Sequence, residues 1–298
     1  WRGMRNGWPK MMSGNALRSE ADAVRLPGSV RVEARLRLGL AHLDGQSRLT
    51  ERHEAGAFRF RFPRAHGRPP EAVLVNVAGG LAGGDSVSID IRLGPSSTLA
   101  LSSATAERIY RSDGSATRLT NGLEIGPDAR MLWLPQETIL FEGAALKRSF
   151  DIDLAATGQL VLGEMLYFGR VASGETVTRG DIRDRWRLRR AGRLAFAEDL
   201  RLDLAGGGAL RDPIALGGHV AIATLLLALP DPPDLLEAIR GIVTEEPGLE
   251  IGTTLVDGLV LLRAAGKDAA LLRRRLLRVA RFVLGRIGMP YPRAFTNE

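Results

Sequence analysis

Residues 30–38 read V-R-V-E-A-R-L-R-L, so apolar and charged side chains alternate along the whole stretch. In an extended strand, successive side chains point to opposite faces of the sheet. The apolar residues from Val30 to Leu38 therefore share one face, and the charged residues between them share the other. This pattern predicts a strand with one face buried in a core and the other exposed to water.

Short segments of the same kind follow one another as far as residue 205, and no helical period lasts more than a turn or two among them. Turn-forming pairs such as Gly94-Pro95 and Asp113-Gly114 separate them. Many short strands predict a sandwich, a barrel or a β-solenoid, and the pattern alone leaves these three open because no repeat of fixed period is present. The predicted strands cover residues 30–38, 58–62, 73–77, 87–93, 99–103, 116–125, 131–134, 150–154, 160–166 and 182–190.

Beyond the glycine triplet at 206–208, helices are mixed with strands. A long helix is predicted at 267–286, because its apolar side chains recur every three or four positions and Pro290 follows it. The other predicted elements are a helix at 234–243 and strands at 219–229, 249–256 and 259–263. We therefore expect a poorly ordered N-terminal extension at 1–28, a β-rich body at 29–205 and a C-terminal α+β subdomain at 206–298.

Charge and composition narrow the class of protein. Lys and Arg number 41 against 34 Asp and Glu, a net charge of +7, but no nucleic-acid-reading motif accompanies this charge. The absence of cysteine excludes disulfides, thiolate metal ligands and cysteine nucleophiles. No apolar run approaches the ~20 residues of a membrane span, and the N-terminal stretch lacks the apolar core of a signal peptide. These features predict a cytoplasmic protein that binds neither membrane nor nucleic acid.

A glycine-rich run, N-V-A-G-G-L-A-G-G-D at 76–85, lies between two predicted strands. A phosphate-binding loop would end in Lys-Ser/Thr and lead into a helix, whereas here Asp85 closes the run and a strand follows. Glycines are expected where a backbone turns tightly or approaches another segment closely. This requirement explains the glycines but not Asp85. The four glycines are Gly79, Gly80, Gly83 and Gly84.

Five blocks, in order, resemble the UreD/UreH family of urease accessory proteins. The run at 76–85 resembles the family's glycine-rich signature, which ends in G-G-D. The other blocks are A-T-A-E-R-I-Y-R-S at 104–112, L-W-L-P-Q-E-T-I-L-F-E-G at 132–143, the stretches 169–175 and 184–187 taken together, and a strand carrying a glutamate at 194–202. Asn76-Val77-Ala78 stands where many members have His-Pro-Pro, so a metal-contacting histidine is absent there.

The resemblance implies a mainly β fold with a many-stranded, β-helix-like body and a small helical C-terminal part. It implies a non-catalytic chaperone of nickel insertion that forms a complex with UreF-like and UreG-like partners, the latter a GTPase, on apo-urease. Nickel(II) would then be in transit through this protein, with no cofactor bound tightly.

Four carboxylates are the candidate contacts for nickel in transit. Asp85 ends the glycine-rich run, while Glu137, Glu164 and Glu198 interrupt apolar stretches. A carboxylate in a buried strand is costly unless it is paired, bound to metal or facing water. The alternative to a metal role is therefore an ion pair with one of the many arginines. The histidines do not pair at metal-ligand spacing.

Two further groups of residues are candidates for other roles. Tyr110 and Arg111 could line a polar site, or form a strand end whose arginine pairs with a buried carboxylate. The arginines of the last predicted helix could contact a partner protein, or form a solvated face. These helical arginines are Arg274, Arg278 and Arg281.

Two functions of other classes compete with the one that the resemblance implies. A β-helical enzyme acting on polysaccharide would need a carboxylate pair flanked by sugar-stacking aromatics, and aromatic residues make up only 5% of the chain. A basic nucleic-acid-binding module would need a reading motif. No nucleophile–base arrangement is apparent, so no catalytic residue is predicted.

Overall fold

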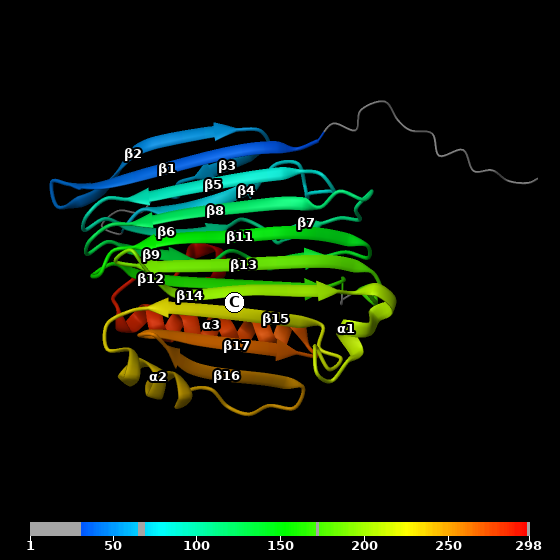
Figure 1. Ribbon diagram of the computed structural model, residues 1–298. Coiled ribbons are helices and arrows are strands. Elements are labelled where there is room, and N and C mark those ends of the chain that lie inside the picture. The colour runs from blue at the N-terminus through cyan, green and yellow to red at the C-terminus, as the bar shows by residue number, and fades with distance from the viewer. Residues whose placement is uncertain (1–30, 65–68, 171–172, 297–298) are drawn as a thin grey trace, which may run out of the picture. The chain divides into compact units, whose positions relative to one another are not determined.

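The computed structural model describes residues 31–64, 69–170 and 173–296. Residues 31–298 form one compact unit, which consists of two stacked β-sheets and a few helices (Figure 1). The predicted N-terminal extension, residues 1–28, lies outside the described residues. The mainly β, β-helix-like fold predicted from the sequence is confirmed.

The first sheet, sheet A, carries the alternating segment that opens the described chain. In the described residues it has seven strands, in the order β14 (Arg193–Asp203), β13 (Gly180–Arg190), β11 (Ala144–Leu154), β8 (Thr117–Ile125), β5 (Ser86–Leu93), β1 (Glu33–Leu43) and β2 (Gln46–Ala55). From β1 through β13 neighbouring strands run parallel, while the two outer strands, β2 and β14, pair antiparallel with their neighbours.

The second sheet, sheet B, faces sheet A. Its main path among the described residues is β16 (Leu249–Val256), β17 (Leu259–Gly266), β15 (Ala221–Ala228), β12 (Gln159–Phe168), β9 (Arg130–Trp133), β6 (Thr98–Ser103), β4 (Glu71–Asn76) and β3 (Phe58–Arg61). Two short strands, β7 (Glu107–Ile109) and β10 (Thr138–Leu140), pair beside the end of β12. The strands that follow the glycine triplet therefore continue sheet B; whether residues 206–298 form a separate subdomain stays a prediction.

The chain winds from one sheet to the other, and this winding makes the body a β-solenoid. It passes from β5 in sheet A to β6 in sheet B, back to β8, on to β9, and so on to β13, and corresponding strands of successive coils pair in parallel. Paired inward positions such as Val87, Leu119, Arg148 and Asp184 are unevenly spaced along the chain, because the turns differ in length. This uneven spacing explains why the sequence shows no fixed repeat.

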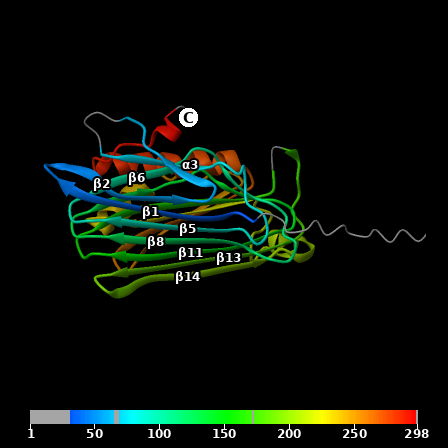
Figure 2. The ribbon, with the colours of Figure 1, turned by 90° about the horizontal axis from the view of Figure 1, so that it is seen from above.

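Two apolar layers stabilise the unit. One fills the space between the sheets, where the Phe150 ring lies 5.4 Å from the Trp133 ring and 5.1 Å from the Trp186 ring. The other lies between sheet B and the helices α2 (Pro232–Arg240) and α3 (Ala269–Arg286). Figure 2 shows α3 on the side of the unit opposite β8, β11, β13 and β14. Both helices match the predicted ones.

Helix α3 begins where the sequence provides a cap. The Asp268 carboxylate accepts hydrogen bonds from the backbone N–H groups of Ala270 and Leu271, which have no partner within the helix. The remaining short elements are the helix α1 (Gly208–Arg211) and 3-10 turns at Ala205–Gly207 and Arg293–Phe295. None of the helices in the described ranges combines the length and the apolar character that a membrane crossing demands.

Hydrogen bonds to Glu142 stabilise the turn before β13. Glu142 belongs to the sequence block L-W-L-P-Q-E-T-I-L-F-E-G at 132–143. Its carboxylate accepts hydrogen bonds from the backbone N–H of Thr178 (2.6 Å), the Thr178 hydroxyl (2.8 Å) and the Arg179 guanidinium (3.0 Å). Burial acts to raise the pKa of Glu142, but these hydrogen bonds outweigh it and lower the pKa to about 2. Glu142 therefore stabilises this turn in its ionised form.

Replacement of Glu142 by glutamine should make stability less dependent on pH in acid. The folded pKa of about 2 lies below the ordinary value of 4.5, so the stabilisation by Glu142 is complete above pH 4.5 and is lost as the pH falls through 2. The difference in unfolding free energy between wild type and Glu142→Gln, measured by urea denaturation, should be largest near neutral pH and shrink below pH 4.5. Glu124→Gln, which removes an exposed pair with Arg92, serves as the control. A pH-independent difference would contradict the assignment.

Candidate functional site

One row of inward-facing positions crosses sheet A and changes from apolar to charged. Strand register places one residue of each strand side by side in this row. Its members are Ala34, Val87, Leu119, Arg148, Asp184 and Leu200. Because burial of a charge is costly without a partner, the two charged members mark a built polar site within the core.

Arg148 is the centre of this site. Its side chain is 4% exposed and contacts two carboxylates. Nε donates to Asp184 Oδ1 (3.1 Å) and Nη2 donates to Asp184 Oδ2 (2.6 Å), a two-pronged contact within sheet A. Nη1 donates to Oε2 of Glu164, which belongs to β12 of sheet B. The guanidinium therefore joins the two sheets through the interior.

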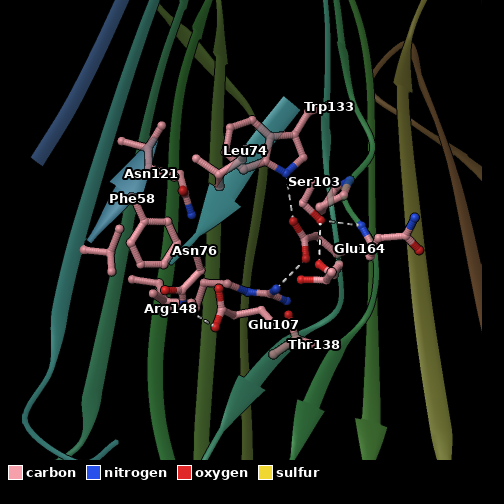
Figure 3. Close-up of a pocket in the computed structure, with 16 residues that line it drawn as sticks. Phe58, Leu74, Asn76, Ser103, Glu107, Asn121, Trp133, Thr138, Arg148 and Glu164 are labelled. Carbon is pink, nitrogen blue, oxygen red and sulfur yellow. Dashed lines mark hydrogen bonds and ion pairs between the residues drawn. The ribbon is translucent and has the colours of Figure 1, made fainter. Parts of the chain in front are cut away.

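Two tryptophans hold the carboxylates in place. The indole N–H of Trp133 donates to Glu164 Oε1 (2.8 Å), and that of Trp186 donates to Asp184 Oδ1 (3.0 Å). Figure 3 shows Glu164 between Trp133 and Arg148. Glu164 thus accepts one hydrogen bond from the guanidinium and Asp184 accepts two, and each also accepts one from a rigid neutral donor, which fixes its orientation.

The charge balance of the site is uneven, because one guanidinium serves two carboxylates. Burial acts to lower the pKa of Arg148, but the charges of Asp184 and Glu164 outweigh it and raise the pKa. Burial also raises the pKa of Glu164, against the opposing effect of Arg148. Arg148 is therefore a permanent cation here, whereas burial favours the protonated, neutral form of Glu164.

A second ion pair crosses from sheet A to sheet B beyond Asp184. Glu198 of β14 lies 2.8 Å from the Arg263 guanidinium of β17. Burial raises the pKa of Glu198, and Arg263 opposes this effect. The Arg263 side chain is half exposed, so the row of interior charges reaches the surface at this end.

Two cavities flank the Arg148–Glu164 pair. The larger, of about 70 Å³, is also lined by Asn76, Glu107 and Asn121 (Figure 3). The smaller, of about 20 Å³, lies on the Asp184 and Glu198 side and is also lined by Asp184, Trp186, Glu198, Leu200 and Thr224. Charged side chains therefore recur through the interior from Glu107 to Glu198, although the walls of the larger cavity are mostly apolar. We call these groups the interior charge row: Glu107, Arg148, Glu164, Asp184, Glu198 and Arg263.

Glu107 is the second carboxylate of the larger cavity, beside Glu164. The Asn76 side-chain amide donates to it at 2.9 Å. Burial raises the pKa of Glu107 to about 7, although the hydrogen bonds from Asn76 and Arg108 oppose the rise. Glu107 can therefore exchange a proton near neutral pH.

The structure brings two of the four predicted carboxylates into the interior charge row, namely Glu164 and Glu198. Glu137 instead pairs with Arg273 of α3 at 3.1 Å. Asp85 is buried, but its two oxygens accept backbone N–H groups of Val32 (2.8 Å) and Ala82 (2.7 Å), and it lines neither cavity. Glu137, Glu164 and Glu198 thus form ion pairs with arginines, which was the alternative to a metal role. Asp85 instead stabilises the glycine-rich run through hydrogen bonds to its backbone.

The local backbone conformation explains the glycines of the glycine-rich run. Gly79, Gly80 and Gly84 have φ values of +79°, +147° and +87°, a region that other residues rarely adopt. A Cβ at Gly83 would lie 2.5 Å from the backbone oxygen of Ser115, so only glycine lets the segments approach this closely. These contacts confirm that the run is a tight crossover between strands.

Tyr110 and Arg111 lie at this crossover and outside both cavities. The Tyr110 hydroxyl donates to the backbone oxygen of Gly79 at 3.1 Å, and its ring packs 4.9 Å from the Phe141 ring. Arg111 forms an isolated bridge with Ala144, and its side chain passes beside Gly143. Both residues belong to a strand end, and no carboxylate partner for Arg111 is found among the described residues.

The helical arginines and the histidines are dispersed. Arg274, Arg278 and Arg281 lie exposed on α3, where the Arg281 guanidinium stacks 4.5 Å from the centre of the Tyr291 ring. His66 lies outside the described residues, and His219 is buried with Nδ1 2.7 Å from the backbone oxygen of Leu216. Within ranges 31–64, 69–170 and 173–296, no three His, Asp or Glu side chains gather as metal ligands would.

Sequence reasoning missed four members of the interior charge row: Glu107, Arg148, Asp184 and Arg263. Arg148 was missed because β11 begins at Ala144, whereas the predicted strand began at residue 150. The signal that could have found it is the unbroken alternation of A-A-L-K-R-S-F-D-I, in which Arg148 shares the face of Leu146 and Phe150.

The fold and the site thus define the chain as a β-solenoid with charged side chains in its interior. The chain matches the family model described as UreD urease accessory protein over residues 32–294. It is 43% identical over 274 residues to the urease accessory protein UreD of Methylobacterium sp. (strain 4-46), covering 90% of this chain and 96% of that protein. The corresponding protein of Rhodopseudomonas palustris (strain HaA2) is 43% identical over 268 residues, covering 90% and 95%.

The chain therefore belongs to the UreD family of urease accessory proteins. The resemblance seen in the five sequence blocks is confirmed, and the protein has a role in urease maturation.

Replacement of Asp85 by alanine should destabilise the fold. The change leaves two partly buried N–H groups, of Val32 and Ala82, without their acceptor, and each loss should cost up to about 1–3 kcal/mol. The unfolding free energy from urea denaturation measures the effect, and Asp90→Ala, at an exposed position of the following strand β5, should change it little. A stability equal to wild type would show that these contacts are dispensable.

Proposed function

We propose that this protein is a non-catalytic, cytoplasmic scaffold that joins UreF-like and UreG-like partners on apo-urease and carries nickel(II) toward its active site. The interior charge row is the route in this proposal, and it is the observation that supports the proposal best. Nickel is the cargo, bound in passing.

The chemistry of the row suits a borderline divalent ion. Carboxylate oxygens bind such ions, and passage requires binding that is favourable yet weak enough for release. Each carboxylate of the row already has a partner: Asn76 for Glu107, Arg148 for Glu164 and Asp184, and Arg263 for Glu198. An ion has to compete with these partners, so retention is weak.

The geometry disfavours the competing polysaccharide enzyme. Its carboxylate pair would have to contact a sugar chain in an open groove. Here the interior carboxylates lie between two sheets, beside cavities of about 70 and 20 Å³ that hold water or ions but no sugar chain. The arginine contacts also keep the carboxylates from acting as a free acid and base.

The outer face of α3 is the proposed partner surface. Arg274, Arg278 and Arg281 are exposed there, and the described residues provide no carboxylate partner for them. A surface of unpaired guanidinium groups favours a partner with an acidic patch. The opposite face of α3 is buried on sheet B, so removing the helix would expose the core, and charge substitutions are the cleaner test.

Replacement of Glu198 by glutamine should reduce the nickel that reaches urease. Glu198 lines the smaller cavity, and Gln keeps its shape but not its charge. After co-expression with the urease subunits and partners, urease nickel content should fall severalfold and recover in part with excess nickel. Glu124→Gln on the outer face should load normally. Early melting of Glu198→Gln with normal nickel loading would make this carboxylate a structural partner of Arg263 only.

The double variant Arg274→Glu/Arg278→Glu should lose co-purification with a UreF-like partner. Both side chains are exposed, so melting should change little, whereas reversal of two charges at an interface repels an acidic patch. Arg92→Glu/Arg118→Glu, at exposed positions of sheet A, is the matched control. Undiminished binding by the α3 variant would place the partner elsewhere.

A further inference from the structure

The Arg148–Glu164 pair forms the wall between the two interior cavities. The residues that line the larger cavity and those that line the smaller one have only Arg148 and Glu164 in common. Both side chains are about 5% exposed and come from opposite sheets. An ion that moves between the cavities therefore has to pass this pair.

Arg148 places a fixed positive charge at that point. The interior has a low effective dielectric, so a guanidinium there repels a second cation far more strongly than it would in water. At the same time it occupies both carboxylates that would attract the cation. As long as Arg148 keeps these contacts, the route is closed.

The contacts of Arg148 are unequal, and this inequality gives a way to open. Nε and Nη2 hold Asp184 at two points, whereas Nη1 alone holds Glu164. Arg148 can release Glu164 and remain paired with Asp184. Trp133 would keep Glu164 in place after the release, because it donates to the other carboxylate oxygen.

We propose that Arg148 is the gate of the interior charge row: a tethered cation that closes the route and prevents Glu164 and Asp184 from retaining an ion. The inference rests on the proposed function, in which a divalent cation passes through the row. An arriving divalent cation takes over Glu164 as the guanidinium withdraws to Asp184, so that no buried carboxylate is left unpaired. When the guanidinium returns to Glu164, it displaces the ion from the pair, and the ion moves on.

The gate is tested by the affinity of the purified full-length protein for nickel chloride. Arg148→Gln removes the tethered cation and leaves two carboxylates to the metal. This variant should bind nickel at least about tenfold more tightly than wild type in titration calorimetry. Without metal it should melt earlier than wild type, and added nickel should raise its melting temperature, because a ligand stabilises the state that binds it.

Arg183→Gln is the matched control. Arg183 is the neighbour of Asp184 on β13 and holds Asp199 at two points of 2.8 Å, but on the exposed face. Its removal should not increase nickel affinity. Arg148→Gln/Glu164→Gln should lose the gain seen in the single variant, which assigns the metal to the interior pair.

A folded Arg148→Gln with the nickel affinity of wild type would overturn the inference. If this variant does not fold, the nickel affinity of Arg148→Lys tests the inference instead. Lysine keeps a buried positive charge, but its single ammonium group cannot hold both carboxylates as the guanidinium does. Tighter nickel binding by the lysine variant supports the gate, and unchanged binding overturns it. These measurements involve no urease. They can therefore support the gate even if the urease experiments contradict nickel delivery, and they can contradict the gate even if delivery is supported.

Discussion

A guanidinium that is buried between two sheets has to find its counter-charge within the core, and Arg148 finds it on both sheets at once. Asp184 provides it along sheet A and Glu164 provides it from sheet B. Loss of one partner from such a buried group costs about 3–5 kcal/mol, so a shift of one sheet against the other is strongly disfavoured. The offset between the sheets thus depends on a polar contact within a mainly apolar core.

The placement of this contact divides the interior of the solenoid. In the row that carries Arg148, the earlier strands contribute the apolar residues Ala34, Val87 and Leu119, of which Val87 and Leu119 also line the larger cavity. The charged members of that row, Arg148 and Asp184, lie on the later strands β11 and β13. The apolar and the charged parts of this row thus lie in successive coils of the same solenoid.

Much of the fold could be predicted from alternation, because most strands bury one face. Strand β2 was not predicted because its side chains are largely exposed on both faces. Strands β7 and β10 were not predicted because three residues are too few to show a period. The interior carboxylates Glu164 and Glu198 stood out as charges within apolar strands. Their partners could not be predicted, because strand register across the coils, and not sequence distance, brings Arg148 to Asp184. Asp85 was conspicuous for a different reason, as the acceptor that closes a crossover.

The uneven turns of the solenoid bear on how such a chain can change length during evolution. Residues added between strands lengthen a turn and leave the stacked rows as they were. One residue added or deleted within β11 before Arg148 would reverse the faces of the following positions, moving the guanidinium outward and a neighbour into the core. Insertions should thus be tolerated at the corners, whereas a change of length within β11 should not.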